Sequence, residues 1–118
     1  MFENAQVGDN IIYKDIRGKL FFAKIEKATP KQVVVKGIRF WRDTGNEVGG
    51  DGYYTSYIFL ITPELEAAAK ADEHARYRER QKGWIINTLH QLDWSRIDDK
   101  TVNLIAEIAK TESEKQKG

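Results

Sequence analysis

The sequence has no cysteine and no apolar stretch approaching the length of a membrane span. The lack of cysteine excludes disulfides and thiolate metal sites, and it is compatible with a reducing compartment. A membrane-spanning helix requires about 20 consecutive apolar residues. We therefore expect a chain that does not span a membrane.

Strong net charge is also missing, because the formal charge of the 118 residues is +1. The chain as a whole therefore has no field that would favour nucleic acid or a membrane surface. Residues 1–6 lack the charged start and apolar run of a secretory signal, so we expect none. With 41% hydrophobic and 31% charged residues, the chain is too apolar for disorder, and we expect a soluble, cytoplasmic protein with one core.

Turn residues, aromatic residues and β-branched residues are concentrated before residue 62. They predict strands over 10–16, 19–27, 32–42 and 53–61, with a flexible glycine loop over 48–52. Gly37 interrupts the alternation of the third strand and is interpreted as a bulge. Four or five short strands joined by close turns predict a small, strongly bent antiparallel β-barrel over residues 1–61.

The rest of the chain, residues 62–118, has helical periodicity. Thr62 and Pro63 are typical of an N-cap and a first helical residue, and they predict a long helix over about 63–92. Asp98 or Asp99 is expected to cap a second helix over about 99–111, after which the chain frays. The predicted fold class is therefore α+β, a small β-barrel followed by a helical extension.

The apolar face of the helical extension is too small for a core of its own. We therefore expect the extension to pack against the barrel or against a second copy of the chain, with Trp84 partly buried in that contact. A homodimer formed through the helical extension is one of the possible assemblies.

Catalytic and metal-binding patterns are weak. Neither His74 nor His90 has a second histidine or carboxylate in a recognised metal-binding pattern, and no serine lies in a nucleophile elbow. Gly49-Gly50-Asp51-Gly52 lacks the following Lys-Ser/Thr and the helix start of a phosphate-binding loop. We predict a protein that is not an enzyme and that has no cofactor and no metal.

The distribution of charge along the chain is more informative than its total. Residues 14–42 contain nine basic and two acidic residues, a charge of +7, so the remainder carries −6. Alternation in the second and third strands predicts a face that combines cations with aromatic rings, as single-stranded nucleic acid requires. The candidate binding residues are Phe22, Lys24, Lys36, Arg39, Trp41 and Arg42. The alternative is that the lysines protect edge strands and the aromatic residues close the barrel.

A second basic cluster lies in the predicted long helix. Helical geometry places Arg76 and Arg80 on one face, which makes them a possible second contact with an acidic partner. The alternative is a solvated helix held by its own ion pairs, such as those of Glu66 with Lys70 and Asp72 with Arg76.

Residues 7–61 resemble the small Src-homology-3-type barrels of Tudor, chromo and KOW modules. The similarity lies in Val7-Gly8-Asp9 before the first strand, in two basic strands, and in Lys36-Gly37-Ile38-Arg39-Phe40 before a glycine turn. The chain also resembles small bacteriophage-encoded proteins, in Thr29-Pro30-Lys31-Gln32-Val33-Val34-Val35 and in the Leu-Ile-Thr-Pro-Glu start of its helix. That resemblance implies a location in the host cytoplasm and either nucleic-acid handling or inhibition of a host machine such as a defence nuclease.

Three functions follow from the sequence. The first is a non-enzymatic binding module that engages nucleic acid, or a nucleic-acid-processing complex, through the basic barrel face. The second is an inhibitor that binds a host protein through protein–protein contacts, and the third is a structural homodimer.

Overall fold

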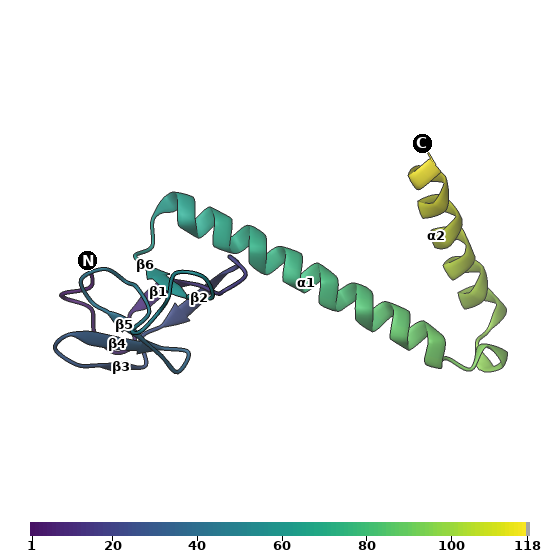
Figure 1. Ribbon diagram of the computed structural model, residues 1–118. Helices are drawn as coiled ribbons and strands as arrows, with labels where there is room; N and C mark the ends of the chain where they lie inside the picture. Colours follow the sequence, from purple (N-terminus) through teal and green to yellow (C-terminus); the bar gives the residue numbers. More distant parts are fainter. Residues whose placement is uncertain (118) are drawn as a thin grey trace. The chain divides into compact units, whose positions relative to one another are not determined.

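The computed structural model describes residues 1–117 and has an α+β fold (Figure 1). All six strands precede the two long helices, as the sequence predicts. The elements, in chain order, are β1 (Asn10–Lys14), β2 (Leu20–Lys24), β3 (Lys27–Ala28), β4 (Gln32–Val35), β5 (Ile38–Trp41), β6 (Tyr57–Phe59), α1 (Pro63–Gln91), the 3₁₀ turn η1 (Trp94–Arg96) and α2 (Asp99–Lys117).

The strands form two antiparallel three-stranded sheets. Sheet A has the order β2-β1-β6 and sheet B has the order β3-β4-β5. Isolated backbone contacts connect the two sheets. The Glu26 N–H donates to the Val34 carbonyl, and isolated β-bridges pair Asn46 with Tyr57 and Glu47 with Phe40. The described strands do not form one continuous closed sheet, and the closed barrel that the sequence suggests is not found among them.

The core lies between the inner faces of the two sheets. Strand alternation sends Ile11 and Tyr13 of β1 to the same interior as Val33, Val35 and Phe40 of sheet B. The other members of this buried cluster are Phe2, Ile25 and Ile58. Each sheet therefore has an outer face that points away from the core.

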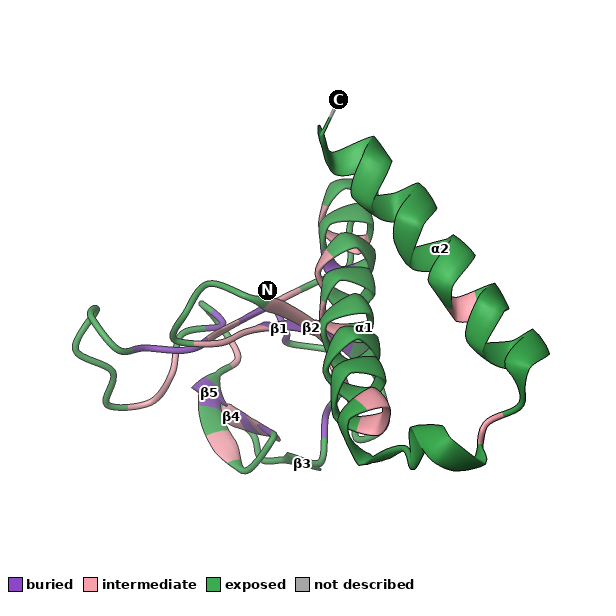
Figure 2. Cartoon of the chain, turned by 90° about the vertical axis from the view of Figure 1, so that its right-hand side faces the viewer, coloured by how far each residue is buried: buried purple, intermediate pink, exposed green. Residues whose placement is uncertain are grey.

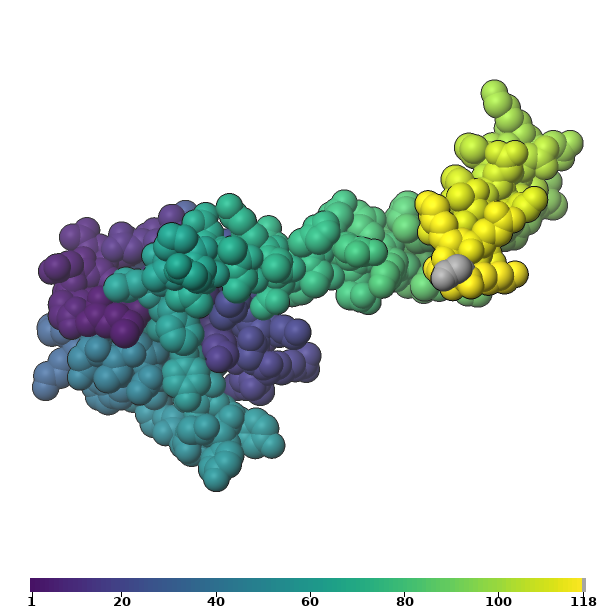
Figure 3. All heavy atoms as spheres, turned by 90° about the horizontal axis from the view of Figure 1, so that it is seen from above, coloured from purple at the N-terminus to yellow at the C-terminus, as the bar shows by residue number. Residues whose placement is uncertain are grey.

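The first half of α1 contacts sheet A at the start of β2. Leu20 of β2 donates its N–H to Asp72 and accepts a hydrogen bond at its carbonyl from Arg76. Ile12 of β1 points away from the core cluster yet is fully buried, as is Ala69 of α1. In the space-filling view the first half of α1 lies next to the N-terminal residues of the chain (Figure 3).

Residues 1–81 form one compact unit, and residues from Lys82 onward form a second. We refer to these as the N-terminal unit and the C-terminal unit. The C-terminal unit contains the last residues of α1, the η1 turn and α2, and no residue from Lys82 to Lys117 is buried (Figure 2). Trp84 is 64% exposed in the single chain, and its partial burial against the β-structure or a second copy stays a prediction.

Helix boundaries agree with the sequence at three ends and differ at the fourth. The Leu65 N–H donates to the Thr62 hydroxyl, which confirms Thr62 as the N-cap of α1. Asp98 caps α2 by accepting the Thr101 N–H at 2.7 Å. However, α2 extends to Lys117 rather than fraying near residue 111, because the polar residues of its last turns are good helix formers.

Candidate nucleic-acid interface

The third predicted strand is in fact a β-hairpin. Lys36 and Gly37 form a two-residue turn between β4 and β5, with φ values of 51° and 75°. Positive φ at both central residues is the geometry of a type I′ turn, whose twist matches that of the flanking strands. The interpretation of Gly37 as a bulge is therefore wrong, although the predicted alternation of the side chains is correct on both sides of it.

This hairpin places Arg39 and Trp41 on the outer face of sheet B. In the antiparallel register Arg39 pairs with Val34 and Trp41 pairs with Gln32. The residue between them, Phe40, is fully buried in the core. Because side chains alternate along a strand, Arg39 and Trp41 point to the opposite side from Phe40.

Strand β3 adds a second cation to the same face. Lys27 pairs with Val34, so Lys27, Val34 and Arg39 form one row across the three strands. Neighbouring strands lie about 4.8 Å apart, which puts the two basic residues roughly 10 Å apart at the backbone. None of the residues in β3, β4 and β5 is acidic. We call the outward residues of sheet B the basic face, and its members are Lys27, Gln32, Val34, Arg39 and Trp41.

A groove opens beside the Trp41 end of the basic face. Its volume is about 420 Å³, and it is lined by Glu3, Pro30, Lys31, Trp41, Arg42 and Asp43. The Trp41 side chain is 37% exposed, which leaves part of its indole accessible. Lys31 adds a further exposed cation at the rim. The basic face therefore combines an aromatic surface with cations on both sides of it.

Two of the predicted binding residues lie elsewhere. Phe22 and Lys24 belong to β2 in sheet A and point to its outer side, while the inward positions of β2 are Phe21 and Ala23. The outer sides of the two sheets face away from each other, so these residues do not share a surface with Arg39 and Trp41. Sequence alternation correctly identifies outward residues, but it does not show that β2 and β5 belong to different sheets.

Lys36 occupies the hairpin turn rather than the basic face. Its ammonium group lies 5.3 Å from the ring centre of Phe21 and 5.9 Å from that of Tyr13. Cation–π contacts of this kind direct the ammonium group toward the end of the core. Lys36 is exposed, but it is directed toward sheet A.

Arg42 has a structural role. Its guanidinium group donates to the carbonyl of Thr29 at 2.7 Å and to those of Phe2 and Ala5 at 3.0 Å each. A longer bond reaches the Glu3 carbonyl. These bonds attach the N-terminal segment to the end of β5 and use the Nε and Nη1 donors of the guanidinium group.

Arg76 and Arg80, which the sequence places on one face of the long helix, have different surroundings in the structure. The guanidinium group of Arg76 donates to the Leu20 carbonyl at 3.0 Å and lies 3.9 Å from the ring centre of Phe21. It holds α1 on sheet A. Arg80 is exposed and lines a shallow depression of about 450 Å³ with Lys70, Glu73, His74 and Tyr77.

Lys27, Lys31 and Gln32 are part of the site but are absent from the sequence-based set. The signal that could have found them is the register of the β4–β5 hairpin. Once Lys36-Gly37 is treated as a turn, Gln32 falls opposite Trp41, and the short strand before Pro30 brings Lys27 next to Val34.

An exposed pair of aromatic residues directly follows the glycine loop, in a segment that local hydrogen bonds hold in place. The Asp51 carboxylate accepts the Tyr53 N–H at 2.9 Å, and this bond is the main cause of the lowered pKa of Asp51. The Thr55 hydroxyl accepts the Gly52 N–H, also at 2.9 Å. This segment displays Tyr53 and Tyr54, which are 85% and 80% exposed.

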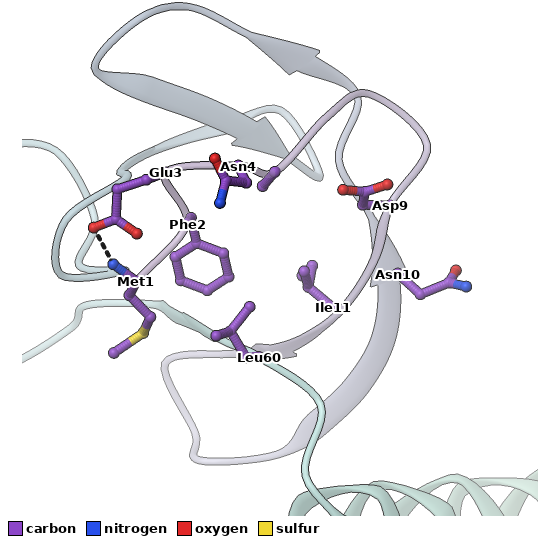
Figure 4. A pocket seen from close by; sticks show the side chains of 9 residues that line it. Met1, Phe2, Glu3, Asn4, Asp9, Asn10, Ile11 and Leu60 are labelled. Atoms are coloured by element: carbon purple, nitrogen blue, oxygen red, sulfur yellow. Dashed lines mark hydrogen bonds and ion pairs between the residues drawn. The ribbon is translucent and has the colours of Figure 1, made fainter.

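Another cavity, of about 360 Å³, lies at the start of the chain (Figure 4). Phe2, Ile11 and Leu60 form its apolar side, and Asp9 and Asn10 line its rim. The N-terminal ammonium group pairs with Glu3 beside it, which is the main cause of the lowered pKa of Glu3.

Residues 1–117 contain no group of three or more His, Cys, Asp or Glu residues arranged to hold a metal ion. Within the same residues, no helix combines the length and apolarity needed to cross a membrane. No protein-family model, curated protein or solved structure matches the chain.

Proposed function

We propose that this protein is a non-enzymatic binding module that engages single-stranded nucleic acid through the basic face of its N-terminal unit. The observation that carries the proposal is the placement of Lys27, Arg39 and Trp41 on one open sheet face without an acidic residue in its strands. This function agrees with the resemblance of residues 7–61 to small barrels and phage-encoded proteins.

The chemistry of each group fits the proposed ligand. Phosphates of a single strand release condensed counterions when they contact Lys27 and Arg39, which makes binding favourable and dependent on salt. An unpaired base can stack on the exposed part of the Trp41 ring. The adjoining groove, at about 420 Å³, is within the usual range for small-ligand sites and is large enough for one base.

A single strand fits better than a duplex. Stacking on Trp41 needs a base whose flat face is free, and bases in a duplex are stacked on each other.

The direct test is fluorescence anisotropy with a labelled single-stranded oligonucleotide at low salt. Arg39→Ala and Trp41→Ala should each weaken binding by about tenfold or more. Arg78→Ala is the matched control, because it removes the same charge from an exposed position on α1. Absence of binding, or an equal loss in the Arg78 variant, would refute the proposal.

A second candidate function is inhibition of a host protein. The observation that favours it is the exposure of Tyr53 and Tyr54 on an ordered loop, because tyrosine is enriched in protein interfaces. Capture of one stoichiometric protein that survives nuclease treatment, and is lost with Tyr53→Ala/Tyr54→Ala, would favour this function over nucleic-acid binding.

A further inference from the structure

The C-terminal unit exposes large apolar side chains and buries none. Six of them are between 45% and 64% exposed, namely Trp84, Ile85, Ile86, Trp94, Leu104 and Ile108. Isolated large apolar residues are common on protein surfaces, but six within 25 residues of chain are not explained in that way. Helices in proteins gain most of their stability from packing an apolar face, and no residue from Lys82 to Lys117 is buried in the single chain.

The exposed apolar residues near the end of α1 occupy too wide an arc of the helix surface for one neighbouring helix to cover. Trp84, Ile85 and Ile86 are consecutive, and each residue advances about 100° around an α-helix. They therefore span about 200° of its circumference, whereas the stripe that faces a single neighbouring layer is about 100° wide. Covering these residues requires more helices than α2 alone.

The exposed area matches what a dimer needs. At roughly 200 Å² for a fully exposed large side chain, the six residues expose about 650 Å² of apolar surface. A standard interface buries about 800 Å² per partner, including a polar rim. One copy of the unit therefore supplies most of one side of a standard interface.

Charge also favours a second copy over a highly charged partner. Residues 82–117 contain six basic and six acidic residues, so this unit has a formal charge of zero. Two identical units therefore meet without net repulsion. A strongly basic or acidic partner, including nucleic acid, would gain no net attraction from this surface.

We propose that the C-terminal unit is a dimerisation element that pairs with the same unit of a second copy of the chain. In a two-fold arrangement each copy contributes the end of α1 and the whole of α2, giving four helices around a shared apolar centre. Leu104 and Ile108 of α2 then pack with Trp84, Ile85 or Ile86. This inference does not depend on nucleic-acid binding.

Sedimentation equilibrium of the full chain tests the proposal. The wild type should be a dimer, and Leu104→Glu should raise the dissociation constant by about a hundredfold or more, because it places a charge in an apolar interface. Asn103→Glu is the matched control, since it introduces the same charge at the neighbouring exposed position and should remain a dimer.

Leu104 is exposed in the single chain, so the β-structure should stay folded in both variants. Protection of the Val33 and Val35 amides from hydrogen exchange would show this. A wild type that is monomeric at all concentrations would overturn the proposal, and so would a dimer that Leu104→Glu and Asn103→Glu weaken equally.

Discussion

At the scale of single residues, Gly45 is the position where a small change should have the largest effect. It is buried, its φ is +76°, and an added Cβ would lie 2.5 Å from the Ile58 carbonyl oxygen and 3.0 Å from the Phe2 ring. Gly45→Ala should therefore lower the free energy of unfolding by about 3 kcal/mol or more. Urea denaturation would measure the loss.

Gly49 provides the control for this prediction. Its φ is nearly the same, +78°, but an added Cβ would meet nothing within 4 Å. Gly49→Ala should cost only the conformational penalty of about 1–2 kcal/mol. Equal losses in the two variants would mean that the contact of Gly45 with Ile58 and Phe2 is not the cause.

Asp98 links the stability of α2 to pH. Hydrogen bonds from the hydroxyl and the backbone N–H of Thr101 lower the pKa of Asp98. Because the folded pKa lies below the unfolded pKa, this stabilisation is fully present above the unfolded pKa and is lost as pH falls through the folded pKa. Helix α2 should therefore lose order in acid, which the backbone chemical shifts of Leu104 would report.

Asp98→Asn separates capping from titration. Asparagine is as good an N-cap as aspartate but carries no titrating carboxyl group. The variant should keep α2 folded at neutral pH and remove its acid-dependent loss. Asp99→Asn, at the first residue of α2, should keep that loss. A titration of α2 that is unchanged in Asp98→Asn would show that another group controls it.

At the scale of elements, the attachment of α1 to sheet A depends on two side chains one helical turn apart. Asp72 accepts the Leu20 N–H at 2.9 Å, and Arg76 donates to the Leu20 carbonyl at 3.0 Å. Leu20 begins β2, which is an edge strand of sheet A. Helix α1 therefore satisfies backbone groups that an open sheet edge would otherwise present to another chain.

Arg76→Ala should lower the free energy of unfolding by about 2 kcal/mol, since it removes a charged hydrogen-bond donor and a cation–π contact with Phe21. Urea denaturation would detect the change. Arg78→Ala, two residues further along α1 and exposed, should stay within about 0.5 kcal/mol of the wild type. If Arg76→Ala has the same free energy of unfolding as the wild type, then the attachment of α1 to sheet A depends mainly on the burial of Ile12 and Ala69.

The sequence predicts elements that local chemistry determines. Thr62-Pro63 and the Asp98-Asp99 pair specify helix starts through bonds within a few residues, and of the two aspartates Asp98 is the cap. Alternation around Val33 and Phe40 likewise identifies the buried side of each strand. These features need no information from distant parts of the chain.

Features that depend on pairing between distant segments could not be predicted in this way. Lys36-Gly37 lacks the Asn-Gly or Asp-Gly signature of a two-residue hairpin turn, so the hairpin was not apparent in the sequence. The assignment of β2 and β5 to different sheets separates Lys24 from Arg39. Arg42 and Arg76 are engaged by carbonyl groups more than ten residues away, which no local pattern indicates.

At the scale of the whole molecule, the dimer and the basic face together predict a dependence on ligand length. If both proposals hold, one dimer carries two basic faces, and a strand long enough to reach both should bind at least about tenfold more tightly than a short one. Leu104→Glu should abolish this gain and leave the affinity for the short strand unchanged. Anisotropy with two oligonucleotide lengths would measure it, and a gain that survives in Leu104→Glu would contradict it.

The central claim is that Lys27 and Arg39 bind the phosphates of a single strand, whereas Trp41 stacks on one of its bases. It is tested most directly by the salt dependence of oligonucleotide affinity in three proteins. In the wild type the log–log slope should be about 0.7 per phosphate contact. Arg39→Ala should reduce the slope by about one contact, whereas Trp41→Ala should weaken binding by roughly 1–3 kcal/mol and leave the slope nearly unchanged. A salt-independent affinity, or the same change of slope in both variants, would contradict the account.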